Sequence, residues 1–222
     1  MKSIKTENDF ISYGSGVYKP SEIEDIIKIP KERVKYWLKL LGEKIDDKPI
    51  FFMKSEKSYY TNFLTMIELY IFNQLRERNI SIPKILIAYN ELKVMLKVDY
   101  PFASSDLFVS GKLIALSENL DFITVNGKRQ FIFDFAKPYF EKIVFNDNSK
   151  LAELYYPLGK ERSIVVNPNV LFGQPTIDGT RISASTLYDL YQSGESKEEI
   201  SEIYSIEVNL VNDVVTFYQG LN

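Results

Sequence analysis

The spacing of apolar positions predicts two short helices near the N-terminus. The first is expected over residues 21–28, where Pro20 lies in the opening turn and its missing N–H leaves no helical hydrogen bond unmade. The second is expected over residues 31–41, with Gly42 as its C-terminal cap. Its apolar positions recur at i, i+3, i+4 and i+7 and form one stripe: Val34, Trp37, Leu38 and Leu41. Two short helices joined by a tight turn predict a helix-turn-helix.

Strand-forming residues follow this pair of helices. Residues 48–53 and 58–63 are predicted to form a hairpin around a loop at residues 54–57. Amphipathic helices are then expected over residues 62–78 and 82–97. A hairpin directly behind the second helix of a helix-turn-helix is a wing, so residues 10–98 are predicted to form a winged helix-turn-helix domain with following helices.

The rest of the chain is predicted to form two smaller units. Residues 99–160 are expected to be a small α+β connector, with strands at 108–116, 122–125 and 129–135, an Asn126-Gly127 hairpin turn, and a short helix and edge strand within 135–146. Residues 161–222 are predicted to be trihelical and similar to a helix-turn-helix, with helices over 183–192, 197–204 and 209–218. Ser196 and Glu199 have the spacing of a capping box, and Gly194 suits a helix end. The expected fold class is therefore mainly α with small β elements (α+β).

Composition narrows the classes of function. The 222 residues include no His and no Cys, which excludes a Ser-His-Asp triad and zinc sites built on imidazole or thiolate. A carboxylate-only magnesium site stays open, so a nuclease is a remote alternative. We expect no enzyme activity and no cofactor. The polar N-terminus and the absence of a long apolar run predict a cytoplasmic protein without a membrane partner.

Charge is distributed unevenly along the chain. Residues 1–60 carry 12 basic and 10 acidic side chains, and residues 61–162 carry 13 and 12. Residues 163–222 carry 2 and 8, a net charge of −6. Phosphate binding needs local positive charge, so the N-terminal domain is the better candidate for binding double-stranded DNA. The acidic tail suits a basic protein instead.

The outward face of the second predicted helix carries the candidate DNA contacts. Lysines recur there at steps of four residues, with Tyr36 beside them and Arg33 at the edge. Such a face suits the major groove, although periodicity alone favours an ordinary solvated face equally. We expect base contacts from Lys31, Arg33, Lys35 and Tyr36, phosphate contacts from Lys54 and Lys57 in the wing, and further contacts from Lys19, Ser21 and Lys39.

The N-terminal region resembles the MerR-type winged-helix superfamily. The matching residues are Tyr18-Lys19-Pro20-Ser21-Glu22-Ile23, Arg33-Val34-Lys35-Tyr36-Trp37 and the hairpin behind them. The resemblance implies major-groove reading by residues 31–39, phosphate contacts from the wing, and a homodimer on a two-fold operator. The chain departs from the superfamily in having no metal-binding cysteines and no long coiled-coil helix. Metal sensing is therefore excluded, and the mode of dimerisation stays open.

The C-terminal region contains the most specific motif of the chain. Residues 173–182 read G-Q-P-T-I-D-G-T-R-I, and the turn G-E-S-K-E-E-I follows at 194–200. They resemble the domain-of-unknown-function 433 family, and with the MerR-like head they are similar to VapB-type antitoxins. This resemblance implies an autorepressor that also binds and neutralises a toxin protein from an adjacent gene, a PIN-like ribonuclease. The alternatives are a stand-alone MerR-like regulator and an interaction protein that does not bind DNA.

The glycines of this motif lack the spacing and the lysine of a phosphate-binding loop. Tight turns at Gly173 and Gly179, with Thr180 capping or preceding a helix, explain them better. Arg181 is predicted to form an ion pair within the chain or across a dimer interface, with a partner or DNA contact as the alternative. Gly179, Thr180 and Arg181 are the candidate protein-interaction residues of the tail.

Overall fold

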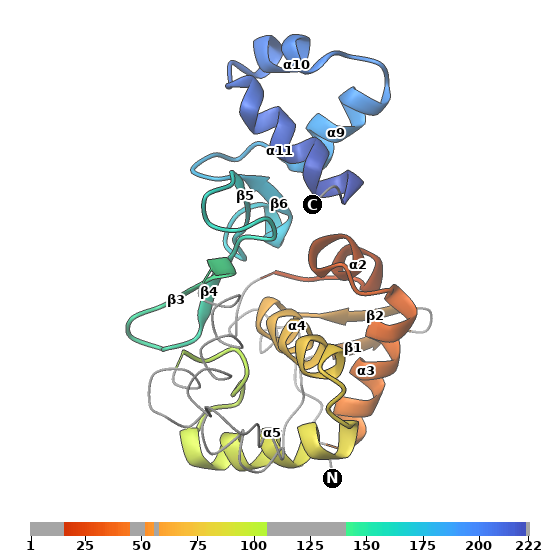
Figure 1. The fold of residues 1–222 in the computed structure, drawn as a ribbon, viewed down its shortest axis with the longest axis vertical. Helices are drawn as coiled ribbons and strands as arrows, with labels where there is room; N and C mark the ends of the chain where they lie inside the picture. The colour runs from red at the N-terminus through yellow and green to blue at the C-terminus, as the bar shows by residue number, and fades with distance from the viewer. Residues whose placement is uncertain (1–15, 45–51, 56–57, 106–140, 221–222) are drawn as a thin grey trace.

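The computed structural model describes residues 16–44, 52–55, 58–105 and 141–220 (Figure 1). The strands and the Asn126-Gly127 turn predicted for residues 108–135 lie outside these ranges, as does Lys57. Within the described ranges the fold is mixed, with seven α-helices, a two-stranded hairpin and a four-stranded antiparallel sheet. Across the same residues, no helix combines the length and the apolar character needed to cross a membrane.

Helices α2 (Pro20–Ile27) and α3 (Lys31–Lys44) form the first pair. Pro20 opens α2, and the helix ends at Lys28, whose φ of 56° places it in the left-handed region. The predicted end of α3 at Gly42 is wrong, because the helix continues through this glycine to Lys44. A glycine within a helix costs only about 1 kcal/mol, which the burial of Leu41 just before it can offset.

The hairpin consists of β1 (Phe52–Ser55) and β2 (Ser58–Thr61). Lys54 lies within β1, opposite Tyr59, whereas the sequence placed it in the loop. Tyr18 extends this small sheet through two backbone hydrogen bonds to Thr61, with N···O distances of 2.8 and 3.0 Å. The segment leading into α2 is therefore attached to the hairpin.

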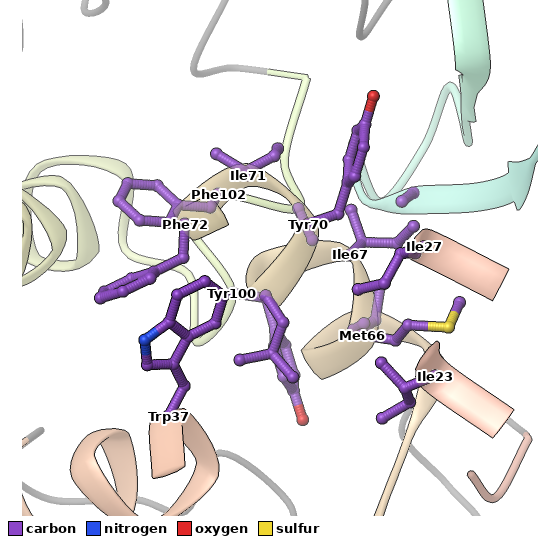
Figure 2. Packing of buried hydrophobic residues seen from close by; sticks show 14 of the residues in the cluster. Ile23, Ile27, Trp37, Met66, Ile67, Tyr70, Ile71, Phe72, Tyr100 and Phe102 are labelled. Atoms are coloured by element: carbon purple, nitrogen blue, oxygen red, sulfur yellow. The ribbon is translucent and has the colours of Figure 1, made fainter. Parts of the chain in front are cut away.

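Helix α4 (Phe63–Glu77) is the centre of the larger hydrophobic core, and α5 (Ile82–Leu96) packs beside it. The Asn62 side chain caps α4 by accepting a hydrogen bond from the Thr65 backbone N–H at 2.8 Å. Figure 2 shows α4 side chains lying between Ile23 and Ile27 of α2 on one side and Trp37 of α3 on another. The Trp37 and Phe72 rings are 5.0 Å apart between centroids. We call residues 16–44, 52–55 and 58–105 the head.

The second sheet has the strand order β3-β4-β5-β6 and is antiparallel throughout. Its strands are β3 (Ile143–Phe145), β4 (Ala152–Tyr155), β5 (Ile164–Val166) and β6 (Pro175–Ile177). The edge strand predicted within residues 135–146 corresponds to β3, whereas β4 and β5 lie in segments where no strand was predicted. The sheet crosses the domain boundary expected near residue 161.

The C-terminal unit, residues 163–220, continues from this sheet into three helices, and we call it the tail. They are α9 (Ala184–Gln192), α10 (Lys197–Tyr204) and α11 (Val208–Gln219), preceded by the short 3₁₀ turn η1 (Leu171–Gly173). The capping box is confirmed: the Ser196 hydroxyl accepts from the Glu199 N–H, and the Glu199 carboxylate accepts from the Ser196 N–H. These helices enclose a second hydrophobic core with Ile164 and Ile177 of the sheet.

The tail contacts the head through α2 (Figure 1). Lys28 Nζ donates a hydrogen bond to the Phe217 carbonyl oxygen at 2.7 Å and lies 4.5 Å from the centre of the Phe217 ring. The Tyr18 ring packs so closely on Gly173 that a Cβ there would lie 1.9 Å from Tyr18 Oη. Helix α10 lies at the far end of the molecule from α5.

Candidate nucleic-acid interface

The outward face of α3 is the candidate nucleic-acid interface. Val34, Trp37, Leu38 and Leu41 are buried as the helical period predicts. The same period leaves the opposite side accessible, with Lys31, Arg33, Tyr36 and Lys39 exposed and Lys35 partly exposed. The structure therefore brings five of the predicted DNA-contacting residues onto a single helix.

An acidic residue reduces the positive charge of this face. Lys35 Nζ lies 2.8 Å from Glu32 Oε1, in an ion pair between residues about one helical turn apart. Both side chains are exposed to solvent. The hydrogen bond from Lys35 lowers the pKa of the Glu32 carboxyl. Glu32 also lies in the first turn of α3, where a negative charge is favourable to the helix dipole. Lys35 is therefore partly occupied by an internal partner.

A hollow of about 360 Å³ adjoins the α3 face. Arg33 and Tyr36 line it from α3, while Asn73, Arg76 and Glu77 line it from the end of α4. The Arg33 guanidinium lies 6.0 Å from the centre of the Trp37 ring, at the outer limit of a cation–π contact. Sequence reasoning missed Arg76, because helical periodicity places a residue on a face but does not say which other helix that face adjoins.

The other predicted DNA contacts that the structure describes belong to the start of α2 and to the hairpin. Lys19 and Ser21 are exposed at the start of α2, and the Lys19 backbone N–H donates to Glu22 Oε2 at 2.7 Å. Lys54 belongs to β1 of the hairpin, and Lys57 lies outside the described residues. The basic side chains therefore come from α2, α3 and the hairpin, all within the head.

The glycine motif of the tail forms a tight turn. Gly179 has a φ of 70°, and the Thr180 hydroxyl donates to the Ile177 carbonyl at 2.8 Å while accepting from the Ile182 N–H at 3.1 Å. Thr180 thus closes the turn and precedes α9, whose N-cap is Ser183. Gly173, with a φ of 86°, also has the tight turn that the sequence predicted.

Arg181 is exposed, and it forms no ion pair within the described part of the chain. An arginine outside the motif forms an ion pair with the tail: Arg162 Nε lies 2.7 Å from Asp213 Oδ1. Asp213 Oδ2 also accepts from the backbone N–H and the hydroxyl of Ser163. The internal pairing expected for Arg181 is therefore made by Arg162 among the residues described.

Acidic residues gather around α10, a surface that sequence reasoning did not single out. Ile203 is 62% exposed on this helix, and its carboxylate neighbours are exposed as well: Glu195, Glu198, Glu199 and Glu202. We call these five residues the α10 surface. An exposed apolar side chain on a helix with exposed carboxylates offers both an apolar contact and a negative field to a basic protein. The charge of these residues was visible in the sequence, but the exposure of Ile203 was not.

Comparisons with known proteins extend over both units. The Mycobacterium tuberculosis H37Rv protein named "Uncharacterized protein Rv2308" is 24% identical over 218 residues, which cover 90% of this chain and 89% of that protein. The crystal structure of Rv2018 from Mycobacterium tuberculosis has a TM-score of 0.67 at 16% identity, covering 89% of this chain and 96% of that one. Such a likeness shows a shared fold across most of both chains. Residues 164–218, from the start of β5 to within the last turn of α11, match the family described as "Protein of unknown function (DUF433)".

Proposed function

We propose that this protein is a DNA-binding transcriptional repressor whose head acts as a winged helix-turn-helix. The observation that carries the proposal is the division of α3 into a buried apolar stripe and an accessible face with four cations and a tyrosine. In this arrangement α3 is the recognition helix, and the β1–β2 hairpin is the wing that follows it. The MerR-like residues of the head support the same assignment and imply a dimer on a two-fold operator.

We further propose that the tail makes the protein an antitoxin. The DUF433 match, the resemblance of the whole chain to VapB-type antitoxins and the acidic α10 surface support this role. The partner is then a basic toxin protein, a PIN-like ribonuclease encoded in an adjacent gene. Because α10 lies beyond α2 from α3, one protomer has room for DNA and the partner at separate surfaces (Figure 1).

Fluorescence anisotropy with a labelled duplex from the protein's own promoter tests the first proposal. We expect salt-dependent binding, and a Lys35→Ala/Lys39→Ala variant should bind at least about tenfold more weakly, because each cation lost removes phosphate or base contacts. Arg33→Ala should lose discrimination between the promoter and a scrambled duplex. Lys160→Ala, which changes an exposed lysine of the sheet region, is the matched control. Equal binding by all variants would refute the assignment of α3.

Co-expression with the product of the neighbouring gene tests the second proposal. A tag on this chain alone should recover a stoichiometric complex, and the toxicity of the partner should be relieved. Ile203→Lys should abolish recovery, whereas Val94→Lys, which alters an apolar side chain that is 78% exposed on α5, should leave it intact. Recovery that is unaffected by Ile203→Lys would move the interface away from α10.

One observation favours a second candidate, an interaction protein that does not bind DNA. The Glu32–Lys35 ion pair neutralises one cation of the α3 face, and the net charge of residues 1–60 is small. In that case, the duplex experiment should show no salt-dependent binding to any sequence, while the partner is still recovered.

A further inference from the structure

A cavity of about 220 Å³ lies where α2 meets the tail. Glu22 and Asp25 of α2 line it on the head side, and Phe172 of η1 and Tyr218 of α11 line it on the tail side. None of the α3 residues proposed to contact DNA lines this cavity. The cavity is therefore separate from the candidate nucleic-acid interface.

The cavity contains negative charge that no lining cation balances. Its lining includes two carboxylates and no lysine or arginine among the residues described. Glu22 accepts the hydrogen bond from the Lys19 backbone N–H, but Asp25 accepts no hydrogen bond from any described residue. Burial raises the pKa of Asp25 even though the Lys28 charge acts in the opposite direction. Asp25 is exposed at the cavity and already feels the Lys28 charge, and a cation bound beside it would favour its charged form further.

The tail side of the cavity holds an aromatic ring in a strained position. Phe172 is 84% exposed, and both Leu171 and Phe172 have left-handed backbones, with φ values of 45° and 57°. Residues other than glycine adopt this conformation at a cost of order 1–3 kcal/mol each, and such strain is concentrated at functional sites. The η1 turn therefore holds a large aromatic side chain in solvent at the rim of an acidic cavity.

A second polar group at this junction also lacks a partner. Tyr18 lines the cavity, is 2% exposed, and its Oη makes no hydrogen bond to any described residue. The hydroxyl lies against Gly173. The two sequence neighbours of this glycine, Phe172 and Gln174, both line the cavity. Buried hydroxyl groups are nearly always hydrogen-bonded, so an unpaired one beside a cavity indicates a missing donor or acceptor.

We propose that this junction cavity binds a small organic cation with a planar apolar body, of the amidinium or guanidinium class. Its charged N–H groups face Asp25 and Glu22, and its body stacks on Phe172. The volume suits a ligand of about the size of a single amino-acid side chain. The proposal does not depend on DNA or toxin binding, because it concerns the contact between α2 and the tail alone.

Titration calorimetry on the full chain tests this site with benzamidine as the probe. Benzamide, which has nearly the same shape and no charge, is the control ligand. We expect saturable binding of benzamidine and at least about tenfold weaker binding of benzamide, since a charge-assisted hydrogen bond to a carboxylate is lost.

Three variants separate the site from general charge attraction. Asp25→Asn and Phe172→Ala should each weaken benzamidine binding, the first by about tenfold or more. Glu195→Gln, which removes an exposed carboxylate of the α10 surface, should leave binding unchanged. Circular dichroism checks that each variant is folded. The proposal is overturned if benzamidine shows no saturable binding, if benzamide binds equally well, or if Glu195→Gln weakens binding as much as Asp25→Asn.

Discussion

At the residue scale, Glu68 is a carboxyl group enclosed by the core of the head. It is 1% exposed, and its oxygens accept hydrogen bonds from the Tyr89 hydroxyl at 2.8 Å and the Phe102 N–H at 3.3 Å. Burial raises its pKa to about 8, and these two hydrogen bonds only partly oppose the shift. A neutral Glu68 is therefore the favoured form in the folded protein below about pH 8.

This raised pKa makes the stability of the head depend on pH. A carboxyl whose folded-state pKa exceeds its unfolded value contributes stability that is complete below the unfolded pKa and is lost as pH rises through the folded pKa. We expect the free energy of unfolding to fall by several kcal/mol as the pH rises from 4.5, the ordinary pKa of a glutamate, to about 8. Urea titrations across this range should show the fall in the wild type and a much smaller fall in Glu68→Gln. Identical pH profiles for the two proteins would contradict the buried-acid interpretation.

The buried hydroxyl of Tyr18 is expected to destabilise the folded protein. Because its Oη has no hydrogen-bond partner among the described residues, Tyr18→Phe should remove an unsatisfied polar group and raise the free energy of unfolding by ~1 kcal/mol in the ligand-free protein. Tyr100→Phe is the control, since the Tyr100 hydroxyl accepts a hydrogen bond from Asn62 Nδ2 at 2.9 Å and its loss should destabilise. Chemical denaturation measures both changes. A loss of stability in Tyr18→Phe would mean that the hydroxyl has a partner.

At the scale of elements, the helices followed from the sequence more closely than the strands did. Helix α10 has the predicted bounds, and α9 and α11 differ from prediction by one residue at one or both ends, because apolar period, capping residues and glycines are all local signals. Strands β4, β5 and β6 are three or four residues long, too short for an alternating pattern, and their pairing joins distant segments. The left-handed Leu171 and Phe172 carry no local signal either, since neither is a glycine or an asparagine.

The candidate interfaces divide in the same way. The α3 face was predictable, because a single helix with a clear apolar stripe also defines its own exposed side. Arg76 and the junction cavity were not, because both require knowing which elements meet in space. The same limit applies to Arg162, which lies just before the acidic segment of residues 163–222. Its ion-pair partner, Asp213, is 51 residues away in the sequence.

The ion pair on α3 leads to a prediction for the element as a whole. Glu32→Gln removes the acidic partner of Lys35 and leaves one more uncompensated cation facing solvent. We expect affinity for every duplex to rise a few-fold and the salt dependence to steepen, because one additional phosphate contact becomes available. Glu24→Gln on α2 is the control. Anisotropy titrations at several salt concentrations give both quantities, and unchanged slopes would show that the α3 face does not contact phosphate.

At the scale of the whole molecule, α2 connects the two units, since it packs on α3 through its apolar residues and holds the tail through Lys28. The contact between Lys28 Nζ and the Phe217 carbonyl should therefore contribute to the attachment of the tail. Lys28→Gly tests this, because glycine tolerates the φ of 56° while removing the side chain. Lys97→Gly is a matched control, as Lys97 caps α5 with the same φ of 56°.

We expect Lys28→Gly to increase hydrogen exchange at the end of α11 and to lower the midpoint of thermal unfolding relative to Lys97→Gly. Both variants relieve a left-handed lysine to a similar degree, so the difference between them isolates the contact with the tail. Hydrogen-exchange mass spectrometry and calorimetry give the two readouts. Equal exchange in the two variants would show that α2 and the tail are held together by the apolar contacts alone.

The DUF433 match begins at residue 164, where strand β5 begins, yet this strand serves two hydrophobic cores. Ile164 packs in the core of the tail, while Val166 pairs with Tyr155 and packs in the core of the head. In a chimaera joined at residue 164, the side chain at position 166 would therefore come from one protein and pack in the head core of another. Residues 164–218 therefore cannot be exchanged on their own in this protein, and a folded chimaera would also have to include β4 and the strands that pair with it.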